Sequence, residues 1–320
     1  MSKRSLSGVQ PSGELHLGNY FGAIRQHVAA QENAFYFIAD FHALTSLGKA
    51  DELRHNTRHV AATYLALGLD PERAVFFRQS DVPQVCEISW ILSNVAAMGL
   101  LERAHSYKDK IAKGLQPKVG LFTYPILMAA DILAYDSDLV PVGKDQVQHV
   151  EITRDLAVAF NAVYASEVFK LPTFTLGTPE VVPGIDGEKM SKSYGNTLPI
   201  FTRGKALKSL VMSIKTDSKG LDDPKDPSTC TVFALHKLFA TPEASAEMAE
   251  RYRAGGYGYG HAKQALLAQI EQHFGPAYER YDALMARPDE LEDRLRVGAV
   301  KARDQAQQVL TRARRACGLE

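Results

Sequence analysis

Two short segments, roughly 170 residues apart, hold the side chains best suited to handling an anionic nucleotide. The first, residues 8–20, has the pattern of a strand end, a turn containing Pro11 and Gly13, and a helix that begins near Gly18. Glycine lets the backbone approach a ligand closely, and the first N–H groups of a helix attract anionic oxygens. His16 and Asn19 add side-chain donors at the same place. This segment therefore predicts a site for nucleotide phosphates.

The second segment is a polar loop with two ammonium groups, and it reads Lys189-Met190-Ser191-Lys192-Ser193. Gly184 and Gly187 precede it and are predicted to act as hinges. A mobile cationic loop suits closure on a triphosphate and neutralisation of the pyrophosphate that leaves. Together, the two segments predict an enzyme that activates a carboxylic acid with ATP.

These segments resemble the HIGH and KMSKS motifs of class I aminoacyl-tRNA synthetases, with His-Leu-Gly-Asn at residues 16–19 as the HIGH variant. The wider stretch at residues 8–20 looks like the bacterial tryptophanyl-tRNA synthetase family in particular. The resemblance continues through residues 40–43, 124–133 and 140–146 and into the C-terminal part, so that it covers nearly the whole chain.

The resemblance implies a tryptophan–tRNA ligase. In such an enzyme the carboxylate of L-tryptophan attacks the α-phosphate of ATP, pyrophosphate leaves, and tryptophan passes from the adenylate to the 3′-terminal ribose of tRNA(Trp). This chemistry needs positioning and charge stabilisation rather than a protein nucleophile. The expected catalytic residues are His16, Asn19, Lys189 and Lys192. Mg²⁺ is expected to be held mainly by the ATP phosphates, with no metal site made by the protein.

A larger set of residues is expected to contact ATP: Gln10, Pro11, Ser12, Gly18, Asn19, Lys110, Gly143, Lys144, Asp145, Val182, Lys189, Met190, Ser191, Lys192 and Ser193. By the resemblance, residues 143–145 meet the ATP ribose, although a Gly-x-Asp helix start alone is usually only an N-cap. Lys144 departs from the acidic residue of many bacterial members, so its contact is left open. For the cluster of Lys108, Lys110 and Lys113, a solvated face is an equal alternative. His27, His55, His59 and His105 lack the setting of His16 and are predicted to be surface residues.

A second candidate site lies in residues 123–131, where Thr123 is predicted to cap a helix that has Pro125 in its first turn. Tyr124, Met128 and Asp131 then share one helix face. A phenol, a thioether and a carboxylate on one face suit a flat aromatic ligand with a single N–H donor, namely indole. Taken singly, the first two residues are also explained by core packing, whereas a buried acid needs a partner. By the resemblance this is the tryptophan pocket, completed by His42, Val140, Val142 and Gln146.

Three alternative functions remain open. Tyrosine specificity on the same scaffold is disfavoured by Met128, because tyrosyl-tRNA synthetases generally carry Gln at the matching place. A small nucleotidyltransferase would usually lack a helical C-terminal part of roughly 120 residues. A non-catalytic synthetase-like paralogue that binds RNA or regulates is disfavoured because no motif looks decayed.

The first 200 residues alternate strand-like and helix-like patterns, with strands predicted at residues 5–9, 35–39, 74–77 and 139–142 and a helix at residues 51–68. This alternation predicts a Rossmann-like, doubly wound parallel sheet with helices on both faces. His16, the pair Asp40 and His42, and residues 143–145 all follow predicted strands. Because ligands bind at the carboxyl ends of parallel strands, these residues are expected to converge on one cleft.

The predicted catalytic domain spans residues 1–200, with a two-helix insertion at about residues 83–120 that by resemblance contributes to a homodimer contact. Residues 201–320 are predicted to form a helical anticodon-binding domain. Its helices are expected at residues 203–214, 231–239, 242–254, 260–274, 278–285 and 290–317, the last of which packs back on the catalytic domain. Residues 255–260 are predicted to be a turn between helices.

The composition fits a soluble globular protein, with 45% hydrophobic residues among 320 and no apolar run of membrane-spanning length. The N-terminus leaves no room for a signal peptide, and the three cysteines are scattered, which together favour the cytoplasm. Formal net charge is zero, yet the chain from Arg294 onward holds seven basic and two acidic residues. Contact with tRNA and a solvated helix face are equal explanations of that tail. DNA and membranes are not expected partners.

Overall fold

The computed structural model describes residues 3–46, 48–104, 118–176 and 181–320. At its centre is a parallel five-stranded sheet in the order β3-β2-β1-β4-β5. The strands are β1 (Ser5–Val9), β2 (Ala34–Ile38), β3 (Ala74–Arg78), β4 (Leu139–Val142) and β5 (Thr173–Leu176). The chain winds outward from β1 to β3 and then crosses to the other side of β1. The predicted Rossmann-like, doubly wound fold is confirmed, and its switch point lies between β1 and β4.

Most strands of the sheet could be predicted from the sequence because they are buried. All five residues of β2 are buried, with Tyr36 and Ile38 in one core cluster and Phe35 and Phe37 in the other. A strand covered on both faces reads as a continuous apolar run. The strands predicted at residues 5–9 and 139–142 have the observed bounds, and the other two differ by one residue at their ends. β5 was not predicted, because its four residues are exposed and do not form such a run.

Helices cover both faces of the sheet. One face is packed by α1 (Leu17–Asn19), the π-helical turn η1 (Tyr20–Ile24), α2 (Arg25–Ala29) and α4 (Ala50–Ala66). The other is packed by α5 (Gln84–Ser93), α8 (Val119–Leu133) and α9 (Val147–Val163). Shorter pieces are α3 (Asp40–Ala43), η2 (Gln79–Asp81), α6 (Met98–Glu102), η3 (Lys144–Gln146) and η4 (Lys192–Tyr194).

The predicted insertion is described only in part. Its described part contains α5 and α6. Residues 105–117 lie outside the described residues, so that Lys108, Lys110, Lys113 and His105 are not placed.

The start of α8 differs from the prediction. The helix begins at Val119, with Lys118 as its N-cap in extended conformation, so Thr123 lies inside the helix and is not its cap. The Thr123 hydroxyl donates a hydrogen bond to the Val119 carbonyl at 3.0 Å. Back-bonding of this kind lets a Thr resemble a cap in sequence while it sits within the helix. Pro125 is likewise internal.

The C-terminal part is helical as predicted, but one of its two longest helices, at residues 259–286, was divided wrongly. The helices are α10 (Gly204–Met212), α11 (Thr231–Lys237), α12 (Pro242–Ala254), α13 (Tyr259–Ala286) and α14 (Pro288–Ala316). The helices predicted at residues 260–274 and 278–285 are both part of α13, which continues through Gly275 and Pro276. Because Gly275 has no Cβ to meet the proline ring, the helix passes Pro276 at the cost of one backbone hydrogen bond.

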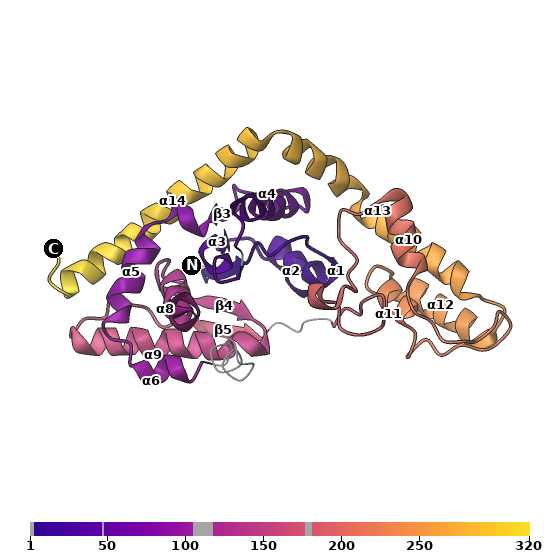
Figure 1. The fold of residues 1–320 in the computed structure, drawn as a ribbon, viewed down its shortest axis with the longest axis horizontal. Helices are drawn as coiled ribbons and strands as arrows, with labels where there is room; N and C mark the ends of the chain where they lie inside the picture. The colour runs from indigo at the N-terminus through magenta and orange to yellow at the C-terminus, as the bar shows by residue number, and fades with distance from the viewer. Residues whose placement is uncertain (1–2, 47, 105–117, 177–180) are drawn as a thin grey trace.

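Two long helices carry the C-terminal part back over the sheet. α13 and α14 meet at an angle, and α14 runs along α4, β3 and α5 (Figure 1). Leu291 and Leu295 of α14 join the core cluster on one face of the sheet, whereas Ala302 and Leu310 join the other. The predicted return of the last helix onto the catalytic part is therefore confirmed. The domain boundary at residue 200 stays a prediction.

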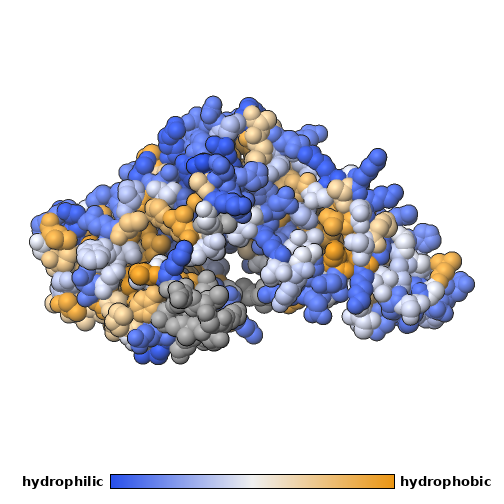
Figure 2. Space-filling view, in the orientation of Figure 1, coloured by the Kyte–Doolittle hydropathy of each residue, from blue (hydrophilic) through white to orange (hydrophobic). Residues whose placement is uncertain are grey.

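The surface is hollowed near the middle of the molecule, to the left of the position that α2 has in Figure 1 (Figure 2). Among the described residues, no helix has both the length and the apolar character needed to cross a membrane.

Candidate active site

The turn after β1 is held rigidly by backbone contacts from a distant segment. His16 precedes α1, and its backbone N–H donates to Asn19 Oδ1 at 3.0 Å. The Leu17 N–H donates to the Leu198 carbonyl, and the Ile200 N–H donates to the Leu15 carbonyl, each at 3.0 Å. Residues 15–17 are thus fixed to the chain that follows the Lys-Met-Ser-Lys-Ser loop.

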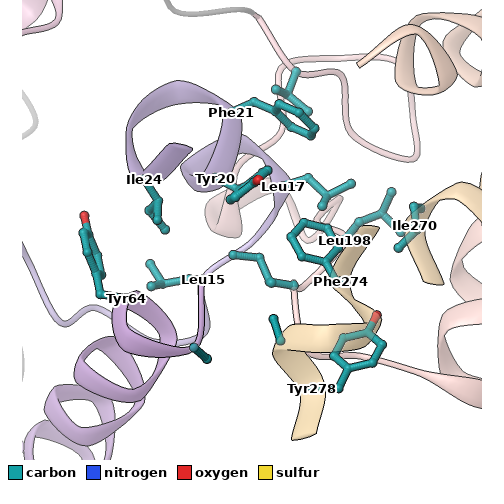
Figure 3. Packing of buried hydrophobic residues seen from close by; sticks show 14 of the residues in the cluster. Leu15, Leu17, Tyr20, Phe21, Ile24, Tyr64, Leu198, Ile270, Phe274 and Tyr278 are labelled. Carbon is teal, nitrogen blue, oxygen red and sulfur yellow. The ribbon is translucent and has the colours of Figure 1, made fainter. Parts of the chain in front are cut away.

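Helix α13 supports the same turn from behind. Leu15, Leu17 and Tyr20 pack against Leu198 and Phe274, so that α1 rests on the C-terminal half of the chain (Figure 3). The Tyr20 hydroxyl lies 2.7 Å from His273 Nε2. Nothing in the sequence signalled this support, because it joins residues more than 250 positions apart.

His59 links the turn to α13 as well. Its Nε2 accepts a hydrogen bond from the Leu15 N–H at 3.1 Å, and its Nδ1 lies 2.7 Å from the Tyr281 hydroxyl. His59 and His27 are both buried, which corrects their prediction as surface residues, whereas His55 is exposed as predicted. Burial lowers the pKa of each buried histidine to about 4.

His16 is a neutral donor set into the nucleotide-binding turn. Burial, and then the charge of Lys192, lowers the pKa of His16 to about 4. Its Nδ1 is buried and makes no hydrogen bond with any residue that the structure describes. A Cβ added to Gly18 would lie 3.0 Å from the His16 ring, so glycine lets the ring pack closely against the backbone there. A buried ring nitrogen without a protein partner fits a site that is completed by a ligand.

The Lys-Met-Ser-Lys-Ser loop is anchored at its centre. Met190 is buried, and its N–H donates to the Val182 carbonyl at 2.9 Å. The Asn196 side chain accepts from the Ser191 N–H at 2.8 Å and donates to the Lys189 carbonyl at 3.1 Å. These contacts leave both lysine side chains exposed at the loop surface.

The two glycines before the loop have different roles. A Cβ on Gly184 would lie 2.3 Å from Asn196 Nδ2, so Gly184 permits close packing, and the hinge predicted there is not apparent. Gly187 has φ +92°, a conformation that favours glycine.

A cavity of about 480 Å³ lies between the turn and the loop. Its lining joins both signature segments and consists of Ser12, His16, Gly18, Asn19, Val182, Lys189, Met190, Ser191, Lys192 and Tyr194. Lys192 Nζ donates to the Ser12 carbonyl at 3.1 Å, and partial desolvation lowers the pKa of this lysine. All four predicted catalytic residues therefore meet at one cavity.

Some of the residues predicted to contact ATP lie outside this lining. Pro11 and Ser193 are next to lining residues, and Gln10 lines the neighbouring cavity described below. Gly143, Lys144 and Asp145 follow β4, which pairs with β1, so they lie at the same carboxyl edge of the sheet. Their predicted contact with the ribose stays a prediction.

A second cavity, of about 390 Å³, opens at the same edge. It is lined by every residue of the predicted tryptophan pocket except Val142, namely His42, Tyr124, Met128, Asp131, Val140 and Gln146. The predicted common face of α8 is confirmed, although the helix starts earlier than expected. Gly8 also lines the cavity, and a Cβ there would meet the Phe37 ring at 2.5 Å.

Asp131 is a buried carboxylate held by two side chains. Only 2% of its surface is exposed. His42 Nε2 donates to Oδ2 at 2.8 Å, and Gln79 Nε2 lies 2.8 Å from both carboxylate oxygens. Burial raises the pKa of Asp131, whereas the hydrogen bonds from His42 and Gln79 oppose that rise. The partner that sequence reasoning required for a buried acid is thus present.

Two residues of this site were missed from sequence. Gln79 is fully buried behind Asp131, and His149 is a lining residue hydrogen-bonded to the Tyr124 hydroxyl. Gln79 comes two residues after the strand predicted at residues 74–77, so its position near a carboxyl end was an available signal. His149 lies in the first turn of α9, and no motif in the sequence marks it.

Comparison with known proteins places this geometry in a family. The sequence profile of the family described as "tRNA synthetases class I (W and Y)" matches residues 2–275. The chain therefore belongs to the class I tRNA synthetases for tryptophan and tyrosine, which are aminoacyl-tRNA ligases.

Within that family, the most similar sequences include tryptophan–tRNA ligases. The ligase of Fusobacterium nucleatum is 52% identical over 99% of this chain and 98% of its own length. That of Rhodopirellula baltica is 52% identical over 99% of each chain. The crystal structure of tryptophanyl-tRNA synthetase from Campylobacter jejuni, complexed with ADP and tryptophan, has 50% identity and a TM-score of 0.94, and the match covers 98% of this chain and 99% of that one. The full-length resemblance to tryptophanyl-tRNA synthetases is therefore confirmed.

Proposed function

We propose that this protein activates L-tryptophan with ATP, releases pyrophosphate, and transfers the tryptophanyl group from the adenylate to the 3′-terminal ribose of tRNA(Trp). The observation that carries the proposal is a pair of cavities at one sheet edge. One is aromatic-lined with a buried carboxylate, and the other is lined by a helix start and a cationic loop. Gln10 and Ser12, two residues apart, line one cavity each, so an amino acid and a nucleotide bound there are neighbours.

The amino-acid cavity fits an indole. Asp131 accepts the indole N–H, and Met128 presents a thioether to the ring. Tyr124 and His149 hold each other through a hydrogen bond at the cavity wall, which limits their movement. A buried acceptor position that the ligand N–H fills discriminates strongly against rings that lack the N–H.

The nucleotide cavity fits the phosphates of ATP. The start of α1, the neutral His16 and the Asn19 amide provide donors to the α-phosphate, where the tryptophan carboxylate attacks. The ammonium groups of Lys189 and Lys192 stabilise the negative charge that develops on the departing pyrophosphate. Mg²⁺ travels with the phosphates; the described residues contain no cluster of three His, Cys, Asp or Glu side chains that could hold a metal ion.

Contacts with tRNA are assigned to residues 201–320. Within the basic tail, Arg312 pairs with Asp136 at 2.6 Å and Arg314 pairs with Glu87 at 2.5 Å, so both are engaged by the sheet-containing part. The Arg315 side chain is 72% exposed, and its ion pair with Glu320 is long, at 3.9 Å. Arg315 is therefore the member of this group best placed to contact a phosphate.

The homodimer is proposed on the same family basis. The exposed side chains Trp90 of α5 and Met98 of α6, at 71% and 62% exposure, fall in the segment expected to contribute to the dimer contact. A cytoplasmic location likewise stays a prediction from the sequence.

Pyrophosphate exchange tests the proposed function. Purified protein with ATP and labelled pyrophosphate should incorporate label into ATP when tryptophan is added, and tyrosine at the same concentration should give background incorporation. Exchange driven by tyrosine would reassign the substrate. Absence of exchange with either amino acid would favour a non-catalytic paralogue. Charging of tRNA(Trp) with labelled tryptophan then tests the second step.

A further inference from the structure

Gln79 lies behind the tryptophan cavity with a fixed orientation. Gln79 is the first residue of η2, directly after the end of β3. Its side chain is fully buried and does not line the cavity. Its Oε1 accepts a hydrogen bond from the Phe41 N–H at 3.1 Å. Because a backbone N–H can only donate, the side-chain amide must present its NH₂ group to Asp131.

This orientation leaves Asp131 with a defined bonding capacity. An ionised carboxylate has about four acceptor positions. The Gln79 NH₂ group lies 2.8 Å from each oxygen and shares a bifurcated hydrogen bond between them, and His42 donates to Oδ2. Because Asp131 lines the cavity, its remaining acceptor capacity is available to an N–H group of a ligand bound there.

The surroundings of Asp131 otherwise disfavour its charge. Asp40 on α3 adds a like charge, and burial removes water. Burial, and then the charge of Asp131, raises the pKa of Cys86 on α5 and of Tyr135 after α8, so both act as neutral groups. The donors that oppose these effects are His42 and Gln79, and of the two only Gln79 binds both oxygens.

We propose that Gln79 is a positioning residue for amino-acid specificity: it holds Asp131 as an oriented anion so that one lone pair faces the ligand N–H. This inference rests on the proposed function, because it assumes that tryptophan occupies the cavity. It assigns part of the discrimination to a residue that never touches the substrate.

The test compares tryptophan with its isostere 3-(benzothiophen-3-yl)alanine, in which sulfur replaces the indole N–H. Pyrophosphate exchange is measured for the wild type and for Gln79→Glu, which keeps the acceptor for Phe41 but replaces the NH₂ donor with oxygen. kcat/KM for tryptophan should fall by about 10–10²-fold, the range for a lost hydrogen bond to a charged group. kcat/KM for the sulfur analogue should change by no more than about threefold, as for a substitution without direct contact.

A second variant keeps the test decisive if Gln79→Glu does not fold. Gln79→Met removes the donor without adding an acid, and it should show the same selective loss together with an acidic limb of kcat/KM for tryptophan moved to higher pH. The direction follows because an anion that loses a donor is protonated more easily. The sulfur analogue should show no such movement.

The matched control is Gln31→Glu. Gln31 is also buried, and its Oε1 accepts from the Asp70 N–H at 2.7 Å, far from the cavity. This variant should keep the wild-type ratio of kcat/KM for tryptophan to kcat/KM for the sulfur analogue. If the Gln79 variants lose kcat/KM equally for tryptophan and for the sulfur analogue, or lose it for neither, the inference is overturned. A wild type that does not use tryptophan would instead overturn the proposed function.

Discussion

Asp131 and His16 show opposite consequences of burial at the scale of single residues. Burial disfavours the charged form of each group, so that it raises the pKa of Asp131 and lowers the pKa of His16 to about 4. Asp131 is surrounded by donors that favour its anion, whereas Lys192 reinforces the neutral state of His16. One residue is thus suited to accept a hydrogen bond from the ligand, and the other to remain a neutral donor near phosphates.

Lys192→Ala should slow adenylate formation by about 10²–10³-fold, the cost of losing one preorganised charge-stabilising donor. Tryptophan affinity should stay nearly unchanged, because a cation at the leaving pyrophosphate acts mainly in the transition state. Stopped-flow measurement of adenylate formation and equilibrium binding of tryptophan separate these effects. The control Lys205→Ala, an exposed lysine on α10, should keep the wild-type rate. A wild-type rate in Lys192→Ala would contradict the assignment.

Sequence reasoning predicted the residues whose chemistry is visible in local patterns. Asp131, Met128 and Tyr124 could be grouped because helical spacing places them on one face, and His16 because a glycine-rich turn surrounds it. Gln79, His59 and His149 could not be grouped in this way, since their roles depend on partners 52, 44 and 25 positions away. Their function comes from tertiary contacts that no short pattern records.

At the scale of elements, α14 covers the open edge of the sheet. β3 is an edge strand, and α14 lies directly against its backbone. A Cβ added to Gly298 would lie 1.9 Å from the Phe76 carbonyl oxygen, so only glycine permits this approach. Covering an edge strand with a helix also prevents the strand from pairing with other chains.

Gly298→Ala should destabilise the protein by about 1–3 kcal/mol or more through overpacking against a backbone that cannot move aside. Helix propensity alone would predict the opposite change in stability, because Ala is favoured over Gly by about 1 kcal/mol in a helix interior. Gly260→Ala in the first turn of α13 is the matched control, because its Cβ would meet nothing within 4 Å, and it should be neutral or slightly stabilising. Urea unfolding measures both. Equal stability of the two variants would show that α14 does not pack as described.

The elements that sequence predicted poorly are those governed by distant packing. α13 continues through Gly275-Pro276 because its buried residues on both sides of Pro276 belong to one core cluster. Tertiary packing there outweighs the local tendency of proline to end a helix. β5 was missed for a different reason: its four exposed residues form no continuous apolar run, and its pairing with β4 defines it.

At the scale of the whole molecule, buried neutral histidines connect stability to pH. The pKa of His16, His27 and His59 is about 4 in the folded protein, against 6.5 as the ordinary value. Between these values the unfolded chain binds more protons than the folded one, so stability falls as pH falls. The contribution of these neutral histidines to the free energy of unfolding is fully present above pH 6.5 and is lost as the pH approaches 4.

Acidification from neutral to about pH 5 should therefore lower the free energy of unfolding by about 1–2 kcal/mol for each of these histidines. Urea unfolding at a series of pH values measures the loss. His27→Gln, which can keep a hydrogen bond to the Tyr64 hydroxyl, should make the free energy of unfolding depend less steeply on pH. A stability that does not change over this range would mean that the histidines titrate normally in the folded state.

The central claim is that tryptophan and the nucleotide occupy neighbouring cavities, with Asp131 reading the indole nitrogen. A crystal structure with a non-hydrolysable tryptophanyl-adenylate analogue tests it most directly. The account predicts an indole nitrogen about 2.9 Å from an Asp131 carboxylate oxygen, with the phosphate at the start of α1 between His16 and Lys192. An indole bound with its nitrogen turned away from Asp131, or a phosphate outside the cavity between the turn and the loop, would contradict it.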